Sequence, residues 1–319
     1  MKIHTLPFTR SPFSKSNITA YKQLKRLVKE GKYDVVHTHT PNASAIVRLA
    51  CRKLRKKGLK IFYTAHGFHF YKGAPLKNWL VYYPIEKLCA RWTDTLITIN
   101  SEDYTRAKKK LHAKNVACVF GVGIDLSKFG ALSVDKVAKC KTLGIPEDAK
   151  LFISVGELND NKNHEIVIKA LEDMNVYYVI AGTGNKKDAL QALIDKQKMA
   201  DRIKLIGYRT DIGELYAVSD FFVFPSFREG LSVSLMEAMA CGLPCAVSNI
   251  RGNTDLIDEN GGACFAPDNV DDVKKVMQYM CDMQDFDRKQ CSVYNKEKIK
   301  SFSNETVISQ MKEIYFFDK

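Results

Sequence analysis

Short apolar runs alternate with longer amphipathic segments along most of the 319-residue chain. In the first half, we expect strands at the runs IHTLPF, YDVVHTH, KIFYTAHG, TDTLITIN and VACVFGVGID, and helices near 18–30, 43–57, 77–92 and from 101. In the second half, the expected strands LFISVGEL, VYYVIAGTG, RIKLIGY, FFVFPS and PCAVSNI alternate with helices from 163 and over 186–199, 211–219 and 233–240, before a mostly helical tail from 271. Two such series predict an α/β fold of two Rossmann-like domains, each with a parallel sheet and right-handed crossovers.

The junction between the two series lies near residues 129–146. We therefore expect a first domain over 1–130 and a second domain over 146–319. Ligands of open α/β sheets bind at the carboxyl ends of the strands. A two-domain version of this fold is expected to place its site in a cleft that both domains face.

The stretch FREGLSVSLMEAMACG, residues 227–242, puts two glutamates eight positions apart. Ser232 is a good N-cap and Gly242 suits the C′ position, so Glu229 is expected just before a short helix and Glu237 near its end. The free N–H groups at such a helix start can bind an anion. Alternatively, Glu229 only interacts with the helix dipole and Glu237 is a solvated helix residue.

Charge is distributed unevenly. Residues 1–130 carry 25 basic against 7 acidic side chains, a net of +18, and the remainder carries 24 against 29, a net of −5. A basic first half suggests an anionic partner, such as a membrane surface, a phosphorylated acceptor or nucleic acid. The alternative is a solvated, lysine-rich face.

Two loops at predicted strand ends suggest phosphate binding. Lys162, in GELNDNKNH, follows a strand and precedes a helix, where it could neutralise a diphosphate. Gly182 and Gly184 in VIAGTG allow close approach of a ligand to the backbone. The third glycine and the acidic partner of a dinucleotide fingerprint are missing, so a nicotinamide enzyme is poorly supported.

Four histidines and nine cysteines are the other candidates for chemistry. His37 and His39 alternate on one strand, and His66 and His69 follow the next, so together they could hold a metal. No carboxylate cluster accompanies them, and we expect one histidine to face the ligand while the others pack or cap. The cysteines are scattered and odd in number, which is typical of reduced thiols in a cytosolic protein.

These pieces resemble family 4 of the retaining glycosyltransferases, which have the GT-B fold. The family signature, a glutamate, seven residues and a second glutamate, is matched by PSFREGLSVSLMEAMACGLPCAVS, and GELNDNKNH, VIAGTG and GYRTDIGELYAVSD fall in the family's order. In the first half, YDVVHTHTP and YTAHGFHFYKGAPLKNWLVYYPIEK are similar to the branch that builds bacterial capsular or exopolysaccharides. The resemblance covers nearly the whole chain and implies two Rossmann-like domains facing a cleft.

The resemblance also implies roles for individual residues. Glu229 would contact the transferred hexose, Glu237 the ribose hydroxyls and Lys162 the diphosphate. The implied catalytic residues are His66 at the sugar-transfer point, Glu229 and Lys162. The implied donor-binding residues are Gly156, Lys162, Gly182, Tyr208 and Arg209 near the base, Arg228, Glu229, Glu237, and the backbone of Gly230, Leu231 and Ser232.

Breaking a sugar–phosphate bond leaves negative charge on a diphosphate. Lys162 and a helix N-terminus can stabilise that charge, so no metal or other cofactor is expected. The resemblance implies a UDP-linked donor, same-face attack by the acceptor hydroxyl and retention of configuration. A second catalytic carboxylate, as in glycosidases, is then not required.

Two departures from the family pattern change the expectation. Glu157 occupies a position where the family often has arginine, so Lys162 carries more of the diphosphate, with Arg228 as a second cation. The opening strand and glycine-rich loop of the family's first domain are not found, and IHTLPF resembles a later element. Roughly fifty residues are judged absent from the size of a strand–helix–strand unit. The expectation is therefore a truncated first domain, a folded second half that binds nucleotide, and impaired transfer.

The leading prediction is a hexosyltransferase that acts on a polyprenyl-diphosphate-linked saccharide in surface polysaccharide synthesis. It is expected to be cytoplasmic and peripheral at the inner face of the cell membrane, with no nucleic-acid partner. Its basic first half would lie near anionic lipid, with aromatic and basic residues at the interface, or with the aromatics in the core: Tyr71, Trp79, Tyr82, Tyr83, Lys72 and Lys77.

Three alternatives stay open. The chain could be a degenerate glycosyltransferase fragment that binds nucleotide only. It could be a metal-dependent hydrolase that uses the histidines, which metal analysis after chelation would distinguish. It could also be a charge-driven lipid or nucleic-acid binding module, for which binding would fall steeply with salt and ignore Glu229 and Glu237.

Overall fold

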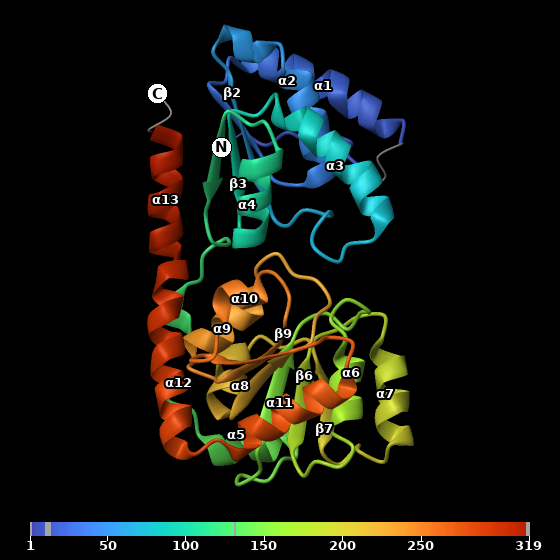
Figure 1. Cartoon of the computed structure of the whole chain (residues 1–319), viewed down its shortest axis with the longest axis vertical. Coiled ribbons are helices and arrows are strands. Elements are labelled where there is room, and N and C mark those ends of the chain that lie inside the picture. The colour runs from blue at the N-terminus through green and yellow to red at the C-terminus, as the bar shows by residue number, and fades with distance from the viewer. Residues whose placement is uncertain (1, 10–13, 131, 317–319) are drawn as a thin grey trace. The chain divides into compact units, whose positions relative to one another are not determined.

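The computed structural model describes residues 2–9, 14–130 and 132–316. The chain forms two compact units (Figure 1): residues up to 121 together with those from 310 onward, and residues 122–309. This division differs from the predicted ranges 1–130 and 146–319 at the junction and at the C-terminus. The end of the last helix packs with the first unit, which the pattern of a single helix does not encode.

The first unit contains one parallel sheet with the strand order β1-β2-β3-β4. Its strands are β1 (Val35–Thr38), β2 (Lys60–Ala65), β3 (Thr95–Thr98) and β4 (Asn115–Cys118). Its helices are α1 (Ser16–Gly31), α2 (Pro41–Cys51), α3 (Leu76–Ala90) and α4 (Ser101–Lys110), with the short 3₁₀ helix η1 (Leu54–Lys57).

Local sequence explains these elements well. All four residues of β3 are buried, as expected for a strand of a parallel sheet that is covered on both faces. The Asn100 side chain caps α4 by accepting from the backbone N–H of Asp103. In α1, Ala20, Leu24 and Val28 recur at four-residue spacing and form its buried stripe.

The predicted strand IHTLPF is wrong, because residues 2–9 form no strand. Pro7 has no backbone N–H to donate to a ladder. Leu6 and Phe8 instead pack against a cluster that includes Leu24 and Val47 of α1 and α2. The segment therefore contributes apolar cover rather than an additional strand.

The second unit contains a six-stranded parallel sheet with the order β10-β9-β8-β5-β6-β7. Its strands are β5 (Leu151–Val155), β6 (Tyr177–Ala181), β7 (Ile203–Gly207), β8 (Phe221–Phe224), β9 (Cys245–Ser248) and β10 (Gly262–Phe265). Its helical elements are η2 (Leu126–Lys128), α5 (Lys136–Leu143), α6 (His164–Ala170), α7 (Lys187–Lys196), α8 (Ile212–Val218), α9 (Val233–Ala240), α10 (Asn253–Leu256), α11 (Val270–Asp282), α12 (Asp285–Lys298) and η3 (Ile299–Phe302). The last helix, α13 (Asn304–Phe316), begins in this unit, and its residues from 310 onward belong to the first.

The two parallel sheets match the predicted α/β class. Four elements of the second unit were not predicted: η2 and α5, at the junction of the two series, and β10 and α10. β10 and α10 have only four residues each, too few for hydrophobic periodicity to define. The largest apolar core lies in this unit, where residues of α6, α7 and α11 pack with residues of β5, β6 and β8. All nine cysteines are free in the structure.

Candidate functional site

The order of the second sheet identifies where a ligand is expected. The chain runs outward from β5 through β6 to β7, then returns to β8 on the other side of β5 and continues to β9 and β10. In open α/β sheets, such a reversal opens a crevice at the carboxyl ends of the two central strands. The loops that leave β5 and β8, residues 156–163 and 225–232, start at this point.

These two loops bring Lys162 and Glu229 together. The Lys162 Nζ lies 2.8 Å from the Glu229 Oε1, and the two side chains are only 18% and 14% exposed. The same Nζ lies 4.5 Å from the ring centroid of Phe224, the last residue of β8. A mostly buried cation is thus held between a carboxylate and an aromatic face, which fixes its position.

Glycines make this packing possible. A Cβ on Gly156 would lie 3.2 Å from the Lys162 side chain, so the missing side chain leaves room for the lysine stem. A Cβ on Gly182 would lie 1.8 Å from the Gly156 carbonyl oxygen, and one on Gly184 would lie 2.2 Å from that of Leu158. The GTG run is therefore required for close contact between the loops after β5 and β6.

Two asparagines that the sequence analysis passed over fix the loops to each other. Asn161 Nδ2 donates to the Arg228 carbonyl at 3.0 Å, and the Phe227 N–H donates to the Asn161 carbonyl at 2.8 Å. Asn163 has a left-handed φ of 53° and donates its side-chain amide to the Pro225 and Pro267 carbonyls. Asparagine tolerates this backbone region better than most residues, which is a signal that could have been read from NDNKN.

The second glutamate lies on α9, as predicted, and the Ser232 side chain caps this helix by accepting from the Leu235 N–H. Glu237 Oε2 is 3.2 Å from the Tyr216 hydroxyl of α8, a contact that the sequence did not predict. Burial raises the pKa of Glu237, and the hydrogen bond from Tyr216 acts in the opposite direction. The carboxylate is thus half-buried and supported by one neutral donor.

The loop before α9 is closely backed by α10. Gly252, at φ 81°, precedes α10, and a Cβ there would lie 2.3 Å from the Gly230 carbonyl oxygen. The backbone of Gly230, Leu231 and Ser232 is therefore supported by a segment that follows β9. Sequence periodicity could not reveal this contact, because α10 is a single short turn.

The three remaining predicted donor residues are less closely held. Tyr208 is 77% exposed just after β7, and the Arg228 side chain is also exposed. Arg209 binds Asp211 through two nitrogens, at 2.8 and 2.5 Å, and Asp211 also pairs with Lys139. These bonds hold the pKa of the Asp211 carboxyl far below its usual range, with the Arg209 bond as the largest cause.

In the first unit, three of the four candidate histidines lie together at strand ends. His39 Nδ1 lies 3.1 Å from His66 Nε2, and the rings of His37 and His39 are 4.3 Å apart. His37 also bonds to Thr64 Oγ1 at 2.8 Å and to the Tyr315 hydroxyl. Burial lowers the pKa of all three, that of His37 to about 4, and for His37 the two neighbouring rings add to the effect.

The fourth histidine is separate. His69 stacks on Tyr82, with ring centroids 4.4 Å apart. Within residues 2–9, 14–130 and 132–316, no three His, Cys, Asp or Glu side chains are arranged to hold a metal ion. In the cluster His37–His39–His66, one hydrogen bond thus links His39 to His66, and His37 adjoins His39 through a ring contact.

Of the two alternatives for the aromatic residues near α3, interface or core, the structure agrees with the core for three of them. Trp79, Tyr82 and Tyr83 of α3 pack against a buried cluster that contains Phe68 and Phe70. The exposed side of α3 is aliphatic: Leu76, Leu80, Val81, Ile85 and Leu88. Because α3 is apolar on its exposed side as well as its buried side, it carries more apolar surface than packing against its own core requires. Among the described residues, no helix is both long and apolar enough to cross a bilayer.

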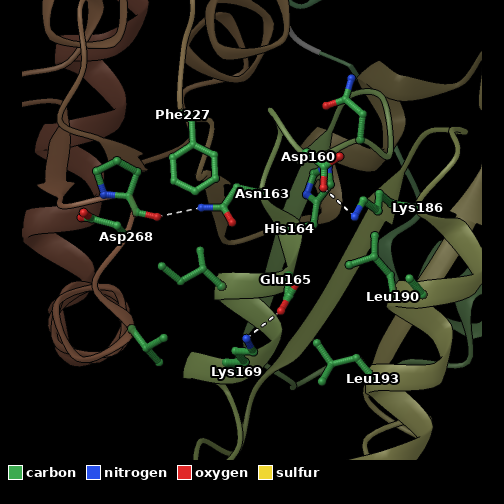
Figure 2. A pocket seen from close by; sticks show the side chains of 15 residues that line it. Asp160, Asn163, His164, Glu165, Lys169, Lys186, Leu190, Leu193, Phe227 and Asp268 are labelled. Carbon is green, nitrogen blue, oxygen red and sulfur yellow. Dashed lines mark hydrogen bonds and ion pairs between the residues drawn. The ribbon is translucent and has the colours of Figure 1, made fainter. Parts of the chain in front are cut away.

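A cavity of about 620 Å³ lies beside α6 and α7 (Figure 2). It shares Asn159, Asp160, Asn163 and Phe227 with the two loops, but neither Lys162 nor a predicted glutamate lines it. Its charged side chains are largely paired with each other, Lys169 with Glu165 and Lys186 with Asp160. The cavity is thus distinct from the predicted donor site.

Comparison with known proteins identifies the family of the chain. Residues 135–298 match the family described as glycosyl transferases group 1, and residues 1–100 match the family described as glycosyl transferase 4-like. The chain is 35% identical to EpsD of Bacillus subtilis, named as a glycosyltransferase, over 98% of this chain and 84% of that protein.

A second relative is the UDP-Gal:alpha-D-GlcNAc-diphosphoundecaprenol alpha-1,3-galactosyltransferase of Escherichia coli. It is 33% identical over 76% of this chain and 64% of its own length.

Solved structures share the fold. A sucrose-phosphate synthase from Thermosynechococcus elongatus superposes with a TM-score of 0.81 at 18% identity, covering 97% of this chain and 80% of that one. The Anabaena protein HepE, in complex with UDP and glucose, gives 0.79 at 18% identity, covering 96% and 84%. The family matches, the identity to EpsD and the two parallel sheets lead to one conclusion: the chain belongs to the group 1 glycosyltransferases and has the GT-B fold.

Proposed function

We propose that the protein is a retaining hexosyltransferase that uses a UDP-linked sugar and needs no metal or other cofactor. The observation that carries the proposal is the Lys162–Glu229 pair at the strand reversal of the second sheet, with Glu237 on the helix that follows. A diphosphate needs a fixed cation, and a sugar and a ribose need carboxylates that accept from hydroxyls. This loop pair offers both kinds of group.

The proposed roles follow from these contacts. Lys162 neutralises the diphosphate, Glu229 binds the hexose and Glu237 accepts from the ribose hydroxyls. Gly156, Gly182 and the backbone of Gly230, Leu231 and Ser232 are proposed to let the donor approach the main chain closely. Tyr208 and Arg209 are proposed to lie near the base, and Arg228 to be a second cation for the diphosphate. In the first unit, His66 is proposed to act at the sugar-transfer point.

In the proposed reaction the acceptor hydroxyl attacks the anomeric carbon on the face from which the diphosphate leaves. The bond from that carbon to the diphosphate oxygen breaks, the new glycosidic bond forms, and the hydroxyl proton passes to the departing phosphate. Lys162 stabilises the charge that develops on the leaving group. No protein nucleophile is needed.

Relatives support the choice of donor and acceptor. The Escherichia coli relative is named for UDP-Gal and for a saccharide on diphosphoundecaprenol. The HepE structure contains UDP and glucose. Another relative is named for O-antigen biosynthesis, and a Klebsiella pneumoniae relative is named as a protein of the cps region. We therefore propose a polyprenyl-diphosphate-linked saccharide as acceptor, in surface polysaccharide synthesis at the inner face of the cell membrane.

The proposed membrane contact is the aliphatic side of α3 rather than its aromatic residues. Leu76 and Leu80 are 72% and 68% exposed, and Lys72, Lys77 and Arg91 beside them are exposed as well. Exposed aliphatic groups flanked by cations suit a bilayer that contains anionic lipid. We propose such a bilayer as the occupant of this surface.

Calorimetric binding of UDP and GDP tests the donor site, with Lys162→Ala and Glu237→Ala beside the wild type. UDP binding that both variants lose, followed by transfer to a diphosphate-linked saccharide, is the expected result. Binding without transfer to any acceptor would favour a fragment that only binds nucleotide. A folded protein that binds neither nucleotide would overturn the proposal. Binding of anionic polymers that ignores both substitutions would indicate a charge-driven module.

A further inference from the structure

Tyr216 supplies a buried hydroxyl next to Glu237. The side chain is fully buried, and its ring lies 5.9 Å from that of Phe222 and 6.4 Å from that of Phe129. Its hydroxyl oxygen is 3.2 Å from Glu237 Oε2 and 3.1 Å from the Ser234 carbonyl oxygen. A rigidly packed ring therefore directs one donor at two acceptors.

A phenol has one proton and can donate to only one of them at a time. When Glu237 is ionised, the charge-assisted bond is the stronger, so the hydroxyl donates to Oε2. When Glu237 is protonated, its carboxyl can donate to the Tyr216 oxygen, and Tyr216 can donate to the Ser234 carbonyl. Both arrangements use the same heavy-atom distances.

We propose that Tyr216 is a positioning residue of the donor site, which holds the Glu237 carboxylate in one orientation and leaves Oε1 available for the ribose hydroxyls. The inference rests on the proposed function, in which Glu237 binds the ribose. It adds a residue of α8 that lies outside the glutamate signature and acts through Glu237.

The surrounding charges support this role. Burial raises the pKa of Glu237, and the Tyr216 bond is the interaction that lowers it. Burial, followed by Glu237, raises the pKa of Tyr216 well above 10, so the phenol keeps its proton.

Other titratable groups on the elements packed around α9 are already engaged or act elsewhere. The Cys241 and Cys245 thiols contribute to the raised pKa of Tyr216, and Lys296 of α12 acts to lower the pKa of Cys241. Asp255 of α10 accepts a hydrogen bond from the Gly252 N–H, and Lys298 beside η3 forms an ion pair with Asp258. Tyr216 is thus the group that offsets the desolvation of Glu237.

The test compares UDP with 2′,3′-dideoxyuridine diphosphate by calorimetry from pH 5 to 8. Tyr216→Phe is expected to weaken UDP binding about three- to tenfold at pH 7.5, the typical effect of one hydrogen bond. The substitution should leave the affinity for the dideoxy nucleotide unchanged. It should also move the midpoint of the pH dependence of UDP binding to higher pH, because the Glu237 carboxyl loses its proton less readily without the Tyr216 hydrogen bond. In a Glu237→Gln background, the same change should have little further effect.

Tyr178→Phe is the matched control. Tyr178 is equally buried, and its hydroxyl bonds to Ser154 Oγ at 2.7 Å, on a different part of the sheet. It should change neither the preference for UDP nor the pH midpoint. If Tyr216→Phe folds poorly, site-specific 3-fluorotyrosine at 216 keeps the ring and strengthens the donor. It is expected to move the midpoint downward.

The outcomes separate the two hypotheses. UDP binding that Glu237→Gln weakens and Tyr216→Phe does not would overturn the role of Tyr216 alone. Equal weakening of both nucleotides by Tyr216→Phe, with an unchanged pH midpoint, would assign it a purely structural part and overturn the inference too. A folded wild type that does not bind UDP would overturn the proposed function, and this inference with it.

Discussion

The side chains at the strand ends differ in kind between the two units. In the second unit, the loops after β5 and β8 hold a charged pair, Lys162 with Glu229, in mostly buried surroundings. In the first unit, the strand ends hold three histidines whose pKa values are lowered by desolvation, that of His37 to about 4. Yet residues 1–130 have a net charge of +18, and the remainder −5.

The difference teaches that the net charge of a region does not describe its site. Many lysines of the first unit lie on exposed positions of helices, such as Lys22, Lys25, Lys56 and Lys109. Their charge acts on distant partners through solvent. A buried pair or a buried histidine acts on a bound ligand at contact distance, where the local surroundings decide the charge. Four predictions test this contrast.

The largest effect is expected at Lys162. Lys162→Ala removes the fixed cation and leaves Glu229 unpaired, so UDP binding and transfer should fall about 100-fold or more. Lys169→Ala is the control, because Lys169 forms a surface pair with Glu165 and is 45% exposed. Steady-state kinetics and calorimetry measure both. A Lys162 variant with wild-type transfer would remove the charged pair from the reaction.

On the first unit, Leu80→Asp tests the aliphatic side of α3. Leu80 is 68% exposed, so the free energy of unfolding should change little. Binding to vesicles with anionic lipid should fall about tenfold, since one leucine contributes about 1.5–3 kcal/mol on burial.

Val293→Asp on α12, at 67% exposure, is the matched control and should bind vesicles like the wild type. Equal sedimentation of all three proteins with vesicles would contradict the proposed membrane surface.

The lowered pKa of His37 predicts acid sensitivity of the first unit. The pKa of His37 falls from its ordinary 6.5 to about 4 on folding. Above pH 6.5 the ring is neutral in both states and has no linked effect. As the pH decreases from 6.5 to 4, the His37 imidazole is protonated in the unfolded chain before it is protonated in the folded chain. The free energy of unfolding therefore decreases over this range, by about 1–2 kcal/mol after solvent screening.

Thermal unfolding from pH 7.5 to 4 measures this loss. His37→Gln should flatten the pH dependence of the melting temperature, because glutamine does not titrate in this range. A His37→Gln variant with the same pH dependence as the wild type would show that other groups cause the acid sensitivity.

The smallest effect is expected at Tyr208. The ring is 77% exposed, and stacking on a base contributes about 1 kcal/mol at such a site. Tyr208→Ala should weaken UDP about fivefold and leave inorganic diphosphate unaffected, as competition binding can measure. If Tyr208→Ala weakened the binding of UDP and of inorganic diphosphate equally, Tyr208 would contribute to phosphate binding and not to base stacking.

Much of the fold could be predicted from local sequence. The helix over 233–240, its Ser232 cap and the strand of β8 follow from signals within a few residues. The strand predicted at IHTLPF failed because β propensity does not reveal whether a neighbouring strand is available, and here Leu6 and Phe8 pack on helices. The sequence left open whether the aromatic residues of α3 lie at an interface or in the core, and only the packing of the helix shows that Trp79, Tyr82 and Tyr83 lie against the core.

What the sequence determined alone is the alternation of elements, the spacing of Glu229 and Glu237, and the residues that can cap, turn or bind a phosphate. These depend on neighbours within one turn or one loop. Only the tertiary structure decided that β8 lies beside β5, which brings Lys162 to Glu229 across 67 positions. It also decided that Tyr216 supports Glu237 and that His39 contacts His66. Such contacts follow from strand order and packing, and periodicity along the chain carries no information about which distant segments become neighbours.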